Sequence, residues 1–210
     1  MSHKPSLYYF HDPMCSWCWG FDNTRKRLFE SLGHEGIEVV RLLGGLAPDS
    51  DEPMAPQMRE YLQQTWRRIQ QRIPGSQFNF DFWTSCEPRR STWPACRAVI
   101  AAREQGAEND ERMTRAIQEA YYLRARNPSD EAVLVTLAGE LGLDRERFEQ
   151  SLRSPATQAQ LDAEIHQGRA MNAISFPGLV VEIESAFWPV PIDYNNAGTM
   201  LETLHMVIHA

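Results

Sequence analysis

The chain has 210 residues, of which 42% are hydrophobic and 23% charged, and its 28 acidic and 21 basic side chains give a formal net charge of −7. This balance is typical of a globular protein with one domain of ordinary size, or with a domain that carries a large insertion. The acidic charge argues against a general nucleic-acid binder, which needs a concentrated basic face, and no apolar run approaches the length of a membrane span.

Residues 1–6 lead directly into the first predicted strand and leave no room for a signal peptide, so we expect a cytoplasmic protein. A network of structural disulfides is not expected in a reducing compartment. A Cys-x-x-Cys motif there indicates redox chemistry or a metal site. The other two cysteines, Cys86 and Cys96, lack the spacing of a second zinc-binding pair, which favours redox chemistry over a metal.

The first predicted strand is the aromatic, β-prone run at residues 7–11. The Cys-x-x-Cys motif follows, with Cys15 and Cys18, and residues 19–32 have the hydrophobic spacing of a helix with Gly33 as its C-cap. A strand that leads into a helix whose first turn carries two cysteines suggests dithiol/disulfide chemistry, because that position lowers the thiol pKa.

A second strand is predicted at residues 37–43, so the chain begins with the β-α-β arrangement of a parallel strand pair. Between about residues 48 and 171 the pattern is helical, with an aromatic connector at residues 78–83. The helices expected there cover residues 54–73, 93–102, 109–126, 130–141, 145–152 and 155–171.

Strands return near the end of the chain, at residues 179–183 and 187–190, where they form a predicted hairpin. A closing helix runs to about residue 208 with Asn195 or Asn196 as its N-cap. The order β-α-β, helical segment, β-β-α predicts an α/β fold in which helices cover one four-stranded sheet.

Two separated motifs give this chain a family resemblance. Residues 12–21, Asp-Pro-Met-Cys-Ser-Trp-Cys-Trp-Gly-Phe, and residues 175–178, Ser-Phe-Pro-Gly, resemble motifs of the DsbA family of disulfide oxidoreductases, in its cytoplasmic, FrnE-like branch. The resemblance implies a thioredoxin-like fold with a large inserted all-helical domain. The thioredoxin-like domain would then be discontinuous, with residues 1–47 and 172–210, and residues 48–171 would form the helical domain.

The resemblance also implies the roles of the site residues. Cys15, at the helix N-terminus, is the expected nucleophile, and Cys18, one turn further on, is the expected resolving thiol. A cis Pro177 opposite the cysteines and the main chain of Phe176 are expected to bind an extended substrate, and Trp17 offers a partner polypeptide an apolar face. Because the chain lacks the Pro-His dipeptide of the secreted oxidants, we expect a milder redox poise.

These observations predict a thiol:disulfide oxidoreductase or isomerase that uses no metal and no organic cofactor. Its substrates would be disulfides of polypeptides or small thiols, with electrons from a thiol partner such as glutathione or a thioredoxin-type protein. Two alternatives stay open: a glutathione-dependent transferase or isomerase of the kappa class, which typically has serine where Cys15 stands, and a non-catalytic, chaperone-like binding module. Cys86 and Cys96 are either a second redox pair or ordinary half-buried thiols.

Overall fold

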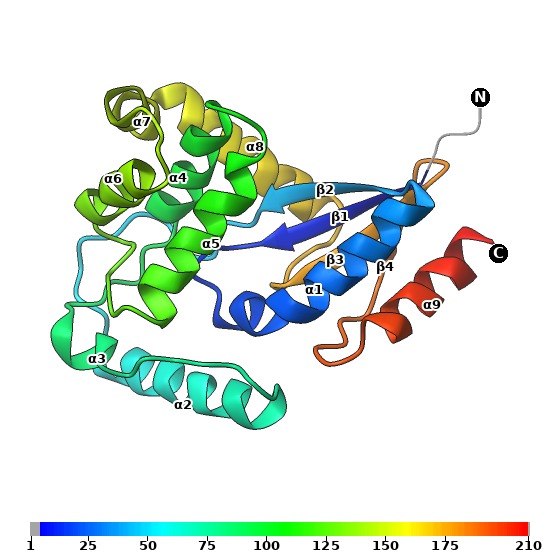
Figure 1. Cartoon of the computed structure of the whole chain (residues 1–210), viewed down its shortest axis with the longest axis horizontal. Helices are drawn as coiled ribbons and strands as arrows, with labels where there is room; N and C mark the ends of the chain where they lie inside the picture. Colours follow the sequence, from blue (N-terminus) through cyan, green and yellow to red (C-terminus); the bar gives the residue numbers. More distant parts are fainter. Residues whose placement is uncertain (1–4, 210) are drawn as a thin grey trace.

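The computed structural model describes residues 5–209, so the predictions made for residues 1–4 and for residue 210 lie outside the described residues. Figure 1 shows a sheet with helices on both of its faces. Helices α4–α8 gather beyond one end of the sheet, and α2 and α3 lie at the bottom of the molecule in this view. No helix in this part of the chain is long and apolar enough to cross a membrane. The predicted α/β fold is confirmed.

The sheet has the strand order β2-β1-β3-β4. Its strands are β1 (Ser6–His11), β2 (Glu38–Leu43), β3 (Gly178–Ile183) and β4 (Ala186–Pro189). β1 pairs in parallel with β2 and antiparallel with β3, and in the second pair Phe10 lies opposite Gly178. The end of β1 and the beginning of β3 therefore meet at one edge of the sheet, although the helical segment separates them in the chain.

Helices α1 (Ser16–Glu35) and α9 (Ala197–Ile208) cover one face of the sheet, with a hydrophobic cluster between them that includes Leu7, Phe21 and Leu28. The other helices are α2 (Pro56–Arg72), α3 (Phe82–Ser85), α4 (Trp93–Arg103), α5 (Asn109–Tyr122), α6 (Glu131–Glu140), α7 (Arg145–Leu152) and α8 (Pro155–Ala170). α8 packs against β2 on the opposite side, where Gly168 allows the ring of Phe10 to approach closely.

The core of the helical segment is aromatic. Trp66 of α2 is fully buried and lies within aromatic contact distance of Trp83, Tyr121 and Tyr122. These contacts explain why the run expected to be a loop at residues 78–83 contains the start of α3: its aromatic side chains pack around Trp66.

Helix α1 differs from its predicted bounds at both ends. It begins at Ser16, three residues before the predicted start, and ends at Glu35. The predicted C-cap at Gly33 is wrong, because Gly36 adopts the left-handed conformation with φ of 70° and donates its N–H to the Gly33 carbonyl. Cys15 is therefore the N-cap residue of α1, and Cys18 lies in its first turn.

Ion pairs connect the sheet to the helical segment. Arg41 of β2 pairs with Asp110 of α5 at 2.6 Å, and Asp110 also pairs with Arg103 of α4. Arg103 also forms an ion pair with Glu164 of α8. The Glu164 carboxylate in turn accepts a hydrogen bond from the backbone N–H of Leu43 at 2.8 Å. These largely buried contacts hold α4, α5 and α8 against β2. The division into residues 1–47 with 172–210 and residues 48–171 stays a proposal.

Candidate active site

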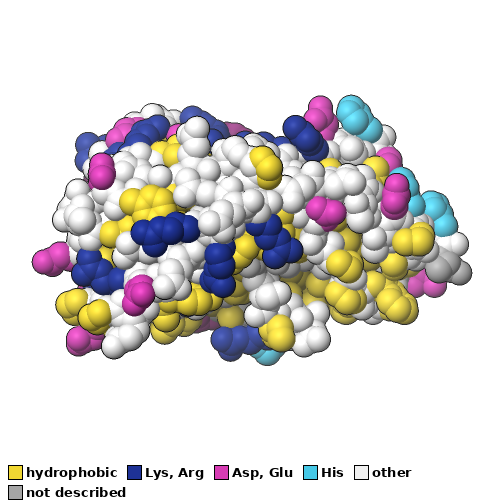
Figure 2. All heavy atoms as spheres, turned by 90° about the horizontal axis from the view of Figure 1, so that it is seen from below, with side chains coloured by type: hydrophobic (Ala, Val, Ile, Leu, Met, Phe, Trp, Pro, Cys, Tyr) yellow, Lys and Arg dark blue, Asp and Glu magenta, His cyan; other side chains and the backbone are white. Residues whose placement is uncertain are grey.

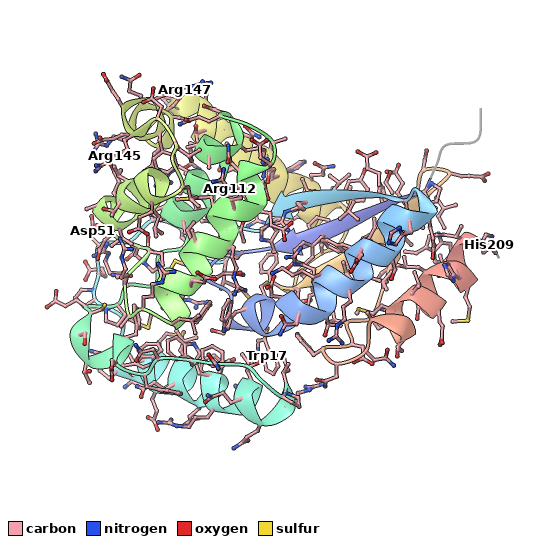
Figure 3. All side chains as sticks on the ribbon, viewed as in Figure 1. Trp17, Asp51, Arg112, Arg145, Arg147 and His209 are labelled. Atoms are coloured by element: carbon pink, nitrogen blue, oxygen red, sulfur yellow. The ribbon has the colours of Figure 1, made fainter. Side chains whose placement is uncertain are left out.

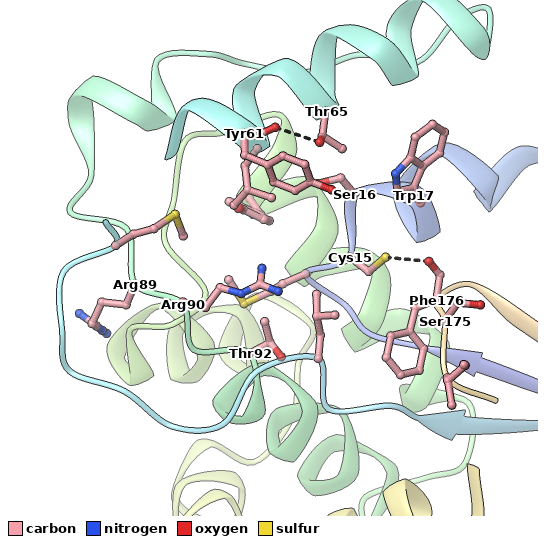
Figure 4. Close-up of a pocket in the computed structure, with 16 residues that line it drawn as sticks. Cys15, Ser16, Trp17, Tyr61, Thr65, Arg89, Arg90, Thr92, Ser175 and Phe176 are labelled. Atoms are coloured by element: carbon pink, nitrogen blue, oxygen red, sulfur yellow. Dashed lines mark hydrogen bonds between the residues drawn. The ribbon is translucent and has the colours of Figure 1, made fainter. Parts of the chain in front are cut away.

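Cys15 is the N-cap residue of α1, with φ of −78° and ψ of 115°. Its carbonyl accepts the N–H of Trp19 at 3.1 Å, and its own N–H donates to the Asp12 carbonyl at 3.0 Å. The Cys15 thiol donates to the carbonyl oxygen of Phe176 across 3.4 Å, as Figure 4 shows. The Cys15 side chain therefore lies at the N-terminal end of α1 and faces the segment that leads into β3.

Cys18 lies one turn further along α1 and is only 1% exposed. Burial raises the pKa of the Cys18 thiol well above its ordinary value, and the neighbouring Cys15 raises this pKa further. All four cysteines are free thiols in this structure. The two cysteines of the motif thus have different environments: Cys15 lines a pocket, whereas Cys18 is buried behind it.

The peptide bond between Phe176 and Pro177 is cis. Phe176 lines the pocket in front of Cys15, whereas Pro177 is buried and is not among the lining residues. The ring of Phe176 occupies the space beside Gly44 at the end of β2, where any Cβ atom would overlap the ring. Gly44 therefore allows this ring to pack beside the site, which the sequence did not indicate.

Trp17 lies at the mouth of the same pocket. Its ring centroid is 5.1 Å from that of Tyr194, and the guanidinium of Arg72 lies 5.8 Å from the Trp17 ring. Figure 3 shows Trp17 between the start of α1 and helix α2. Trp17 is half-buried, and part of its apolar surface faces the pocket.

Asp12 stabilises the loops around Cys15 through its buried carboxylate, a role that the sequence did not indicate. Its carboxylate is fully buried and accepts hydrogen bonds from the N–H of Met14 and of Leu46, both at 2.8 Å, and from the hydroxyl of Thr92 at 2.6 Å. Burial raises the pKa of Asp12, while these hydrogen bonds oppose the rise. Asp12 thereby joins the end of β1 to the loops at residues 44–47 and 89–92.

The pocket in front of Cys15 has a volume of about 210 Å³. Six stretches of chain surround it: the start of α1, the loop between β2 and α2, helix α2, the loop before α4, the end of α5, and the segment that leads into β3. The described residues that line it are Met14, Cys15, Ser16, Trp17, Leu46, Met54, Tyr61, Leu62, Thr65, Arg89, Arg90, Thr92, Tyr121, Ile174, Ser175 and Phe176.

Cys86 and Cys96 bind different partners. The half-buried Cys86 thiol donates to the Ala125 carbonyl at 3.1 Å, and the buried Cys96 thiol donates to the Asp12 carboxylate at 3.5 Å. Burial raises the pKa of both thiols. These environments are those of packed, unreactive thiols, and the second redox pair stays a hypothesis.

His11, at the end of β1, is fully buried and stacks on Tyr9 with ring centroids 4.9 Å apart. Within residues 5–209 its Nε2 atom has no hydrogen-bond partner. Burial and, secondarily, the positive charge of Arg41 lower the pKa of His11 well below its ordinary value of 6.5. His11 is therefore a neutral core residue at pH 7.

This histidine makes the fold sensitive to acid. Because the folded-state pKa lies below the unfolded-state value of 6.5, the unfolded state binds more protons as the pH falls below 6.5. We expect the free energy of unfolding to decrease there by up to about 1.4 kcal/mol per pH unit from this group. Urea titrations of wild type and His11→Phe between pH 7 and pH 5 measure this slope. The pH dependence of the free energy of unfolding should be weaker in His11→Phe and unchanged in the exposed-site control His34→Phe. An unchanged pH dependence in His11→Phe, or an equal reduction in His34→Phe, would contradict the role given to His11.

A family model described as Thioredoxin matches residues 8–186. The matched region contains most of β1, all of β2 and β3, the helical segment between β2 and β3, and both sides of the pocket. The fold and the Cys-x-x-Cys pair at the start of α1 define a thioredoxin-fold protein of the DsbA type. The chain belongs to this thioredoxin family, and the predicted family resemblance is confirmed.

Solved structures agree with this assignment. The chain is 25% identical to a candidate protein disulfide isomerase from Nitrosomonas europaea, with a TM-score of 0.83 over 99% of this chain and 98% of that one. The fold also matches the cytosolic disulfide reductase DsbM from Pseudomonas aeruginosa, at 23% identity and a TM-score of 0.77, over 98% of this chain and all of that one. Both of these structural neighbours carry the names of disulfide-exchange proteins.

A curated relative has a different kind of name. The chain is 28% identical over 187 residues to the ClpXP adapter protein SpxH of Halalkalibacterium halodurans. The match covers 84% of this chain and 58% of that protein, so the chain spans little more than half the length of this relative.

Proposed function

We propose that this protein catalyses thiol–disulfide exchange through Cys15 and Cys18. The observation that carries the proposal is the position of Cys15, whose thiol lies at the N-terminus of α1, lines a pocket and contacts the Phe176 carbonyl. A disulfide sulfur that approaches this thiol would lie beside the main chain of residues 175–176. An extended substrate peptide could form main-chain hydrogen bonds with this segment. The location we propose is the cytoplasm.

The chemistry takes two displacements. The Cys15 thiolate attacks one sulfur of a substrate disulfide, a new S–S bond forms, and the first substrate thiolate leaves. Cys18 then loses its proton and attacks the Cys15 sulfur, which releases the second substrate thiolate and leaves a Cys15–Cys18 disulfide. The protein gives up two electrons and two protons, and a thiol partner such as glutathione returns them in the reverse sequence.

The comparisons support the reductive direction. DsbM is named a cytosolic disulfide reductase, and one of its matching structures, with a TM-score of 0.75, contains GSH. Polypeptide disulfides and small-thiol disulfides are both suitable substrates on this proposal. Phe176 and Trp17 line the pocket, where they would contact such a substrate, while the buried Pro177 would shape the main chain behind it.

Thiol mapping tests the proposal. We expect Cys15 and Cys18 to form a disulfide together when the reduced protein is equilibrated with glutathione disulfide, while Cys86 and Cys96 stay reduced because burial keeps them protonated. Acid quenching, alkylation and peptide mass spectrometry measure each thiol. Four free thiols at high glutathione disulfide would contradict exchange chemistry, and coupled loss of Cys86 and Cys96 would establish the second redox pair.

A second candidate function is protein binding, because the curated relative is named an adapter protein. Binding of a reduced, unfolded client by a Cys15→Ser, Cys18→Ser double variant separates the two functions. Client binding that survives loss of both thiols would favour the adapter role, and binding that disappears with them would favour exchange. The kappa-class alternative predicts glutathione conjugation to a chromogenic electrophile.

A further inference from the structure

The pocket in front of Cys15 has an unusual charge for this protein. Although the chain has a formal net charge of −7, the described residues that line the pocket include Arg89 and Arg90 and no aspartate or glutamate. Asp12 lies beneath the pocket floor, but it is fully buried and its oxygens accept hydrogen bonds from the protein itself. The accessible charge in the pocket is therefore positive.

The two arginines are not equivalent. Arg89 donates to the Asp130 carboxylate at 2.6 Å and to the Ser129 carbonyl at 2.7 Å, so its charge is already paired. Arg90 has no hydrogen-bond or ion-pair partner among residues 5–209, although it is half-buried. In Figure 4 the guanidinium of Arg90 extends into the middle of the pocket, toward the side on which Cys15 lies, whereas Arg89 points away.

Helix α2, which forms one wall of the pocket, adds to this positive charge. Its sequence contains four arginines and one glutamate. Figure 2, which looks onto the face that carries α2, shows lysine and arginine side chains along this face. A cleft lined with charge of one sign raises the local concentration of oppositely charged substrates.

We propose that Arg90 is an anion subsite that recognises a carboxylate on a small thiol or disulfide bound next to Cys15. A guanidinium offers paired N–H donors that match the geometry of a carboxylate, and a half-buried, unpaired guanidinium gains most from such a partner. The pocket volume of about 210 Å³ suits a small molecule or the end of a peptide. This inference rests on the proposed function, because it names the substrate class of the same site.

The test uses binding without chemistry. In a Cys15→Ser background, which cannot form a mixed disulfide, we expect S-methylglutathione to bind more tightly than its diethyl ester in calorimetric titrations. Arg90→Gln should weaken binding of the acid about tenfold, equivalent to about 1.4 kcal/mol, and remove the preference over the ester. Arg90→Lys keeps the charge and should recover part of the preference. The matched control Arg27→Gln, on the exposed side of α1, should change nothing.

Two results would overturn the subsite. One is the absence of acid binding in the Cys15→Ser background. The other is an Arg90→Gln variant that binds both ligands as before, or loses both equally. Because this titration involves no exchange step, a failure of the proposed function would appear separately: wild-type Cys15 and Cys18 would stay reduced in glutathione disulfide while the preference for the acid persisted.

Discussion

Replacing Cys15 by serine is expected to abolish the reduction of insulin disulfides by this protein. A serine hydroxyl at the α1 N-cap cannot form the mixed disulfide on which the proposed exchange depends, and it is not ionised at neutral pH. The expected residual rate is that of the glutathione or dithiothreitol present, measured as insulin turbidity under matched conditions. The stability of the variant should change little, because the S–H group is a weak donor and makes one hydrogen bond, at 3.4 Å to the Phe176 carbonyl.

The partner variant has a different expected result. Cys18→Ser retains the nucleophile Cys15 but lacks the thiol that resolves the mixed disulfide. We therefore expect a covalent complex between Cys15 and the substrate thiol, visible by mass spectrometry. Cys86→Ser is the matched control, since Cys86 is a half-buried thiol with a single partner, the Ala125 carbonyl. Insulin reduction by Cys15→Ser at the wild-type rate would rule out the proposed mechanism.

Replacing Asp12 by asparagine is expected to lower the free energy of unfolding by about 3 kcal/mol. Both carboxylate oxygens of Asp12 accept hydrogen bonds, Oδ1 from Met14 and Oδ2 from Leu46 and Thr92. The asparagine side chain has one acceptor oxygen and one donor nitrogen. The protein groups that face its nitrogen therefore lose their acceptor, and a buried N–H group is left without a hydrogen bond.

Chemical denaturation measures this loss, with Asp51→Asn as the control because Asp51 is exposed. The milder variant Thr92→Val removes one of the four hydrogen bonds to the Asp12 carboxylate, of which the Cys96 thiol donates the fourth, and its stability should fall between those of the two asparagine variants. Because Asp12 also holds the backbone just before Cys15, we expect the exchange rate of Asp12→Asn to fall in the temperature range where the variant is folded. Equal stabilities for Asp12→Asn and Asp51→Asn would contradict the structural role.

The local parts of the fold were predictable from the sequence because they depend on local chemistry. The strand before Cys15, the helix after it and the α9 cap at Asn196, whose side chain accepts the Gly198 N–H, follow from short-range patterns. The predicted C-cap of α1 was wrong because positions 33 and 36 both carry glycine, and either can end a helix. Only tertiary context determines that Gly36 adopts the left-handed conformation.

The support of the site was less predictable, because its contacts join distant residues. The partners of Asp12 lie 34 and 80 positions away at Leu46 and Thr92, and no local pattern links them. The space beside Gly44 is needed only because Phe176 packs there, which requires β2, β1 and β3 to be neighbours. The unpaired state of Arg90, in contrast to the paired Arg89, is also a property of the assembled pocket.

The pairing of Phe10 with Gly178 has a consequence for how this molecule can vary. The two sides of the site lie 161 positions apart in the chain, at Cys15 and Phe176, yet one antiparallel strand pair brings them together. Turns far from that pair, such as the left-handed one at Gly142 between α6 and α7, can therefore be lengthened or shortened without separating the sulfur from its carbonyl partner. Length changes in descendants of this chain should accumulate in such distal turns, while the spacing from Phe10 to Cys15 and from Phe176 to Gly178 stays constant.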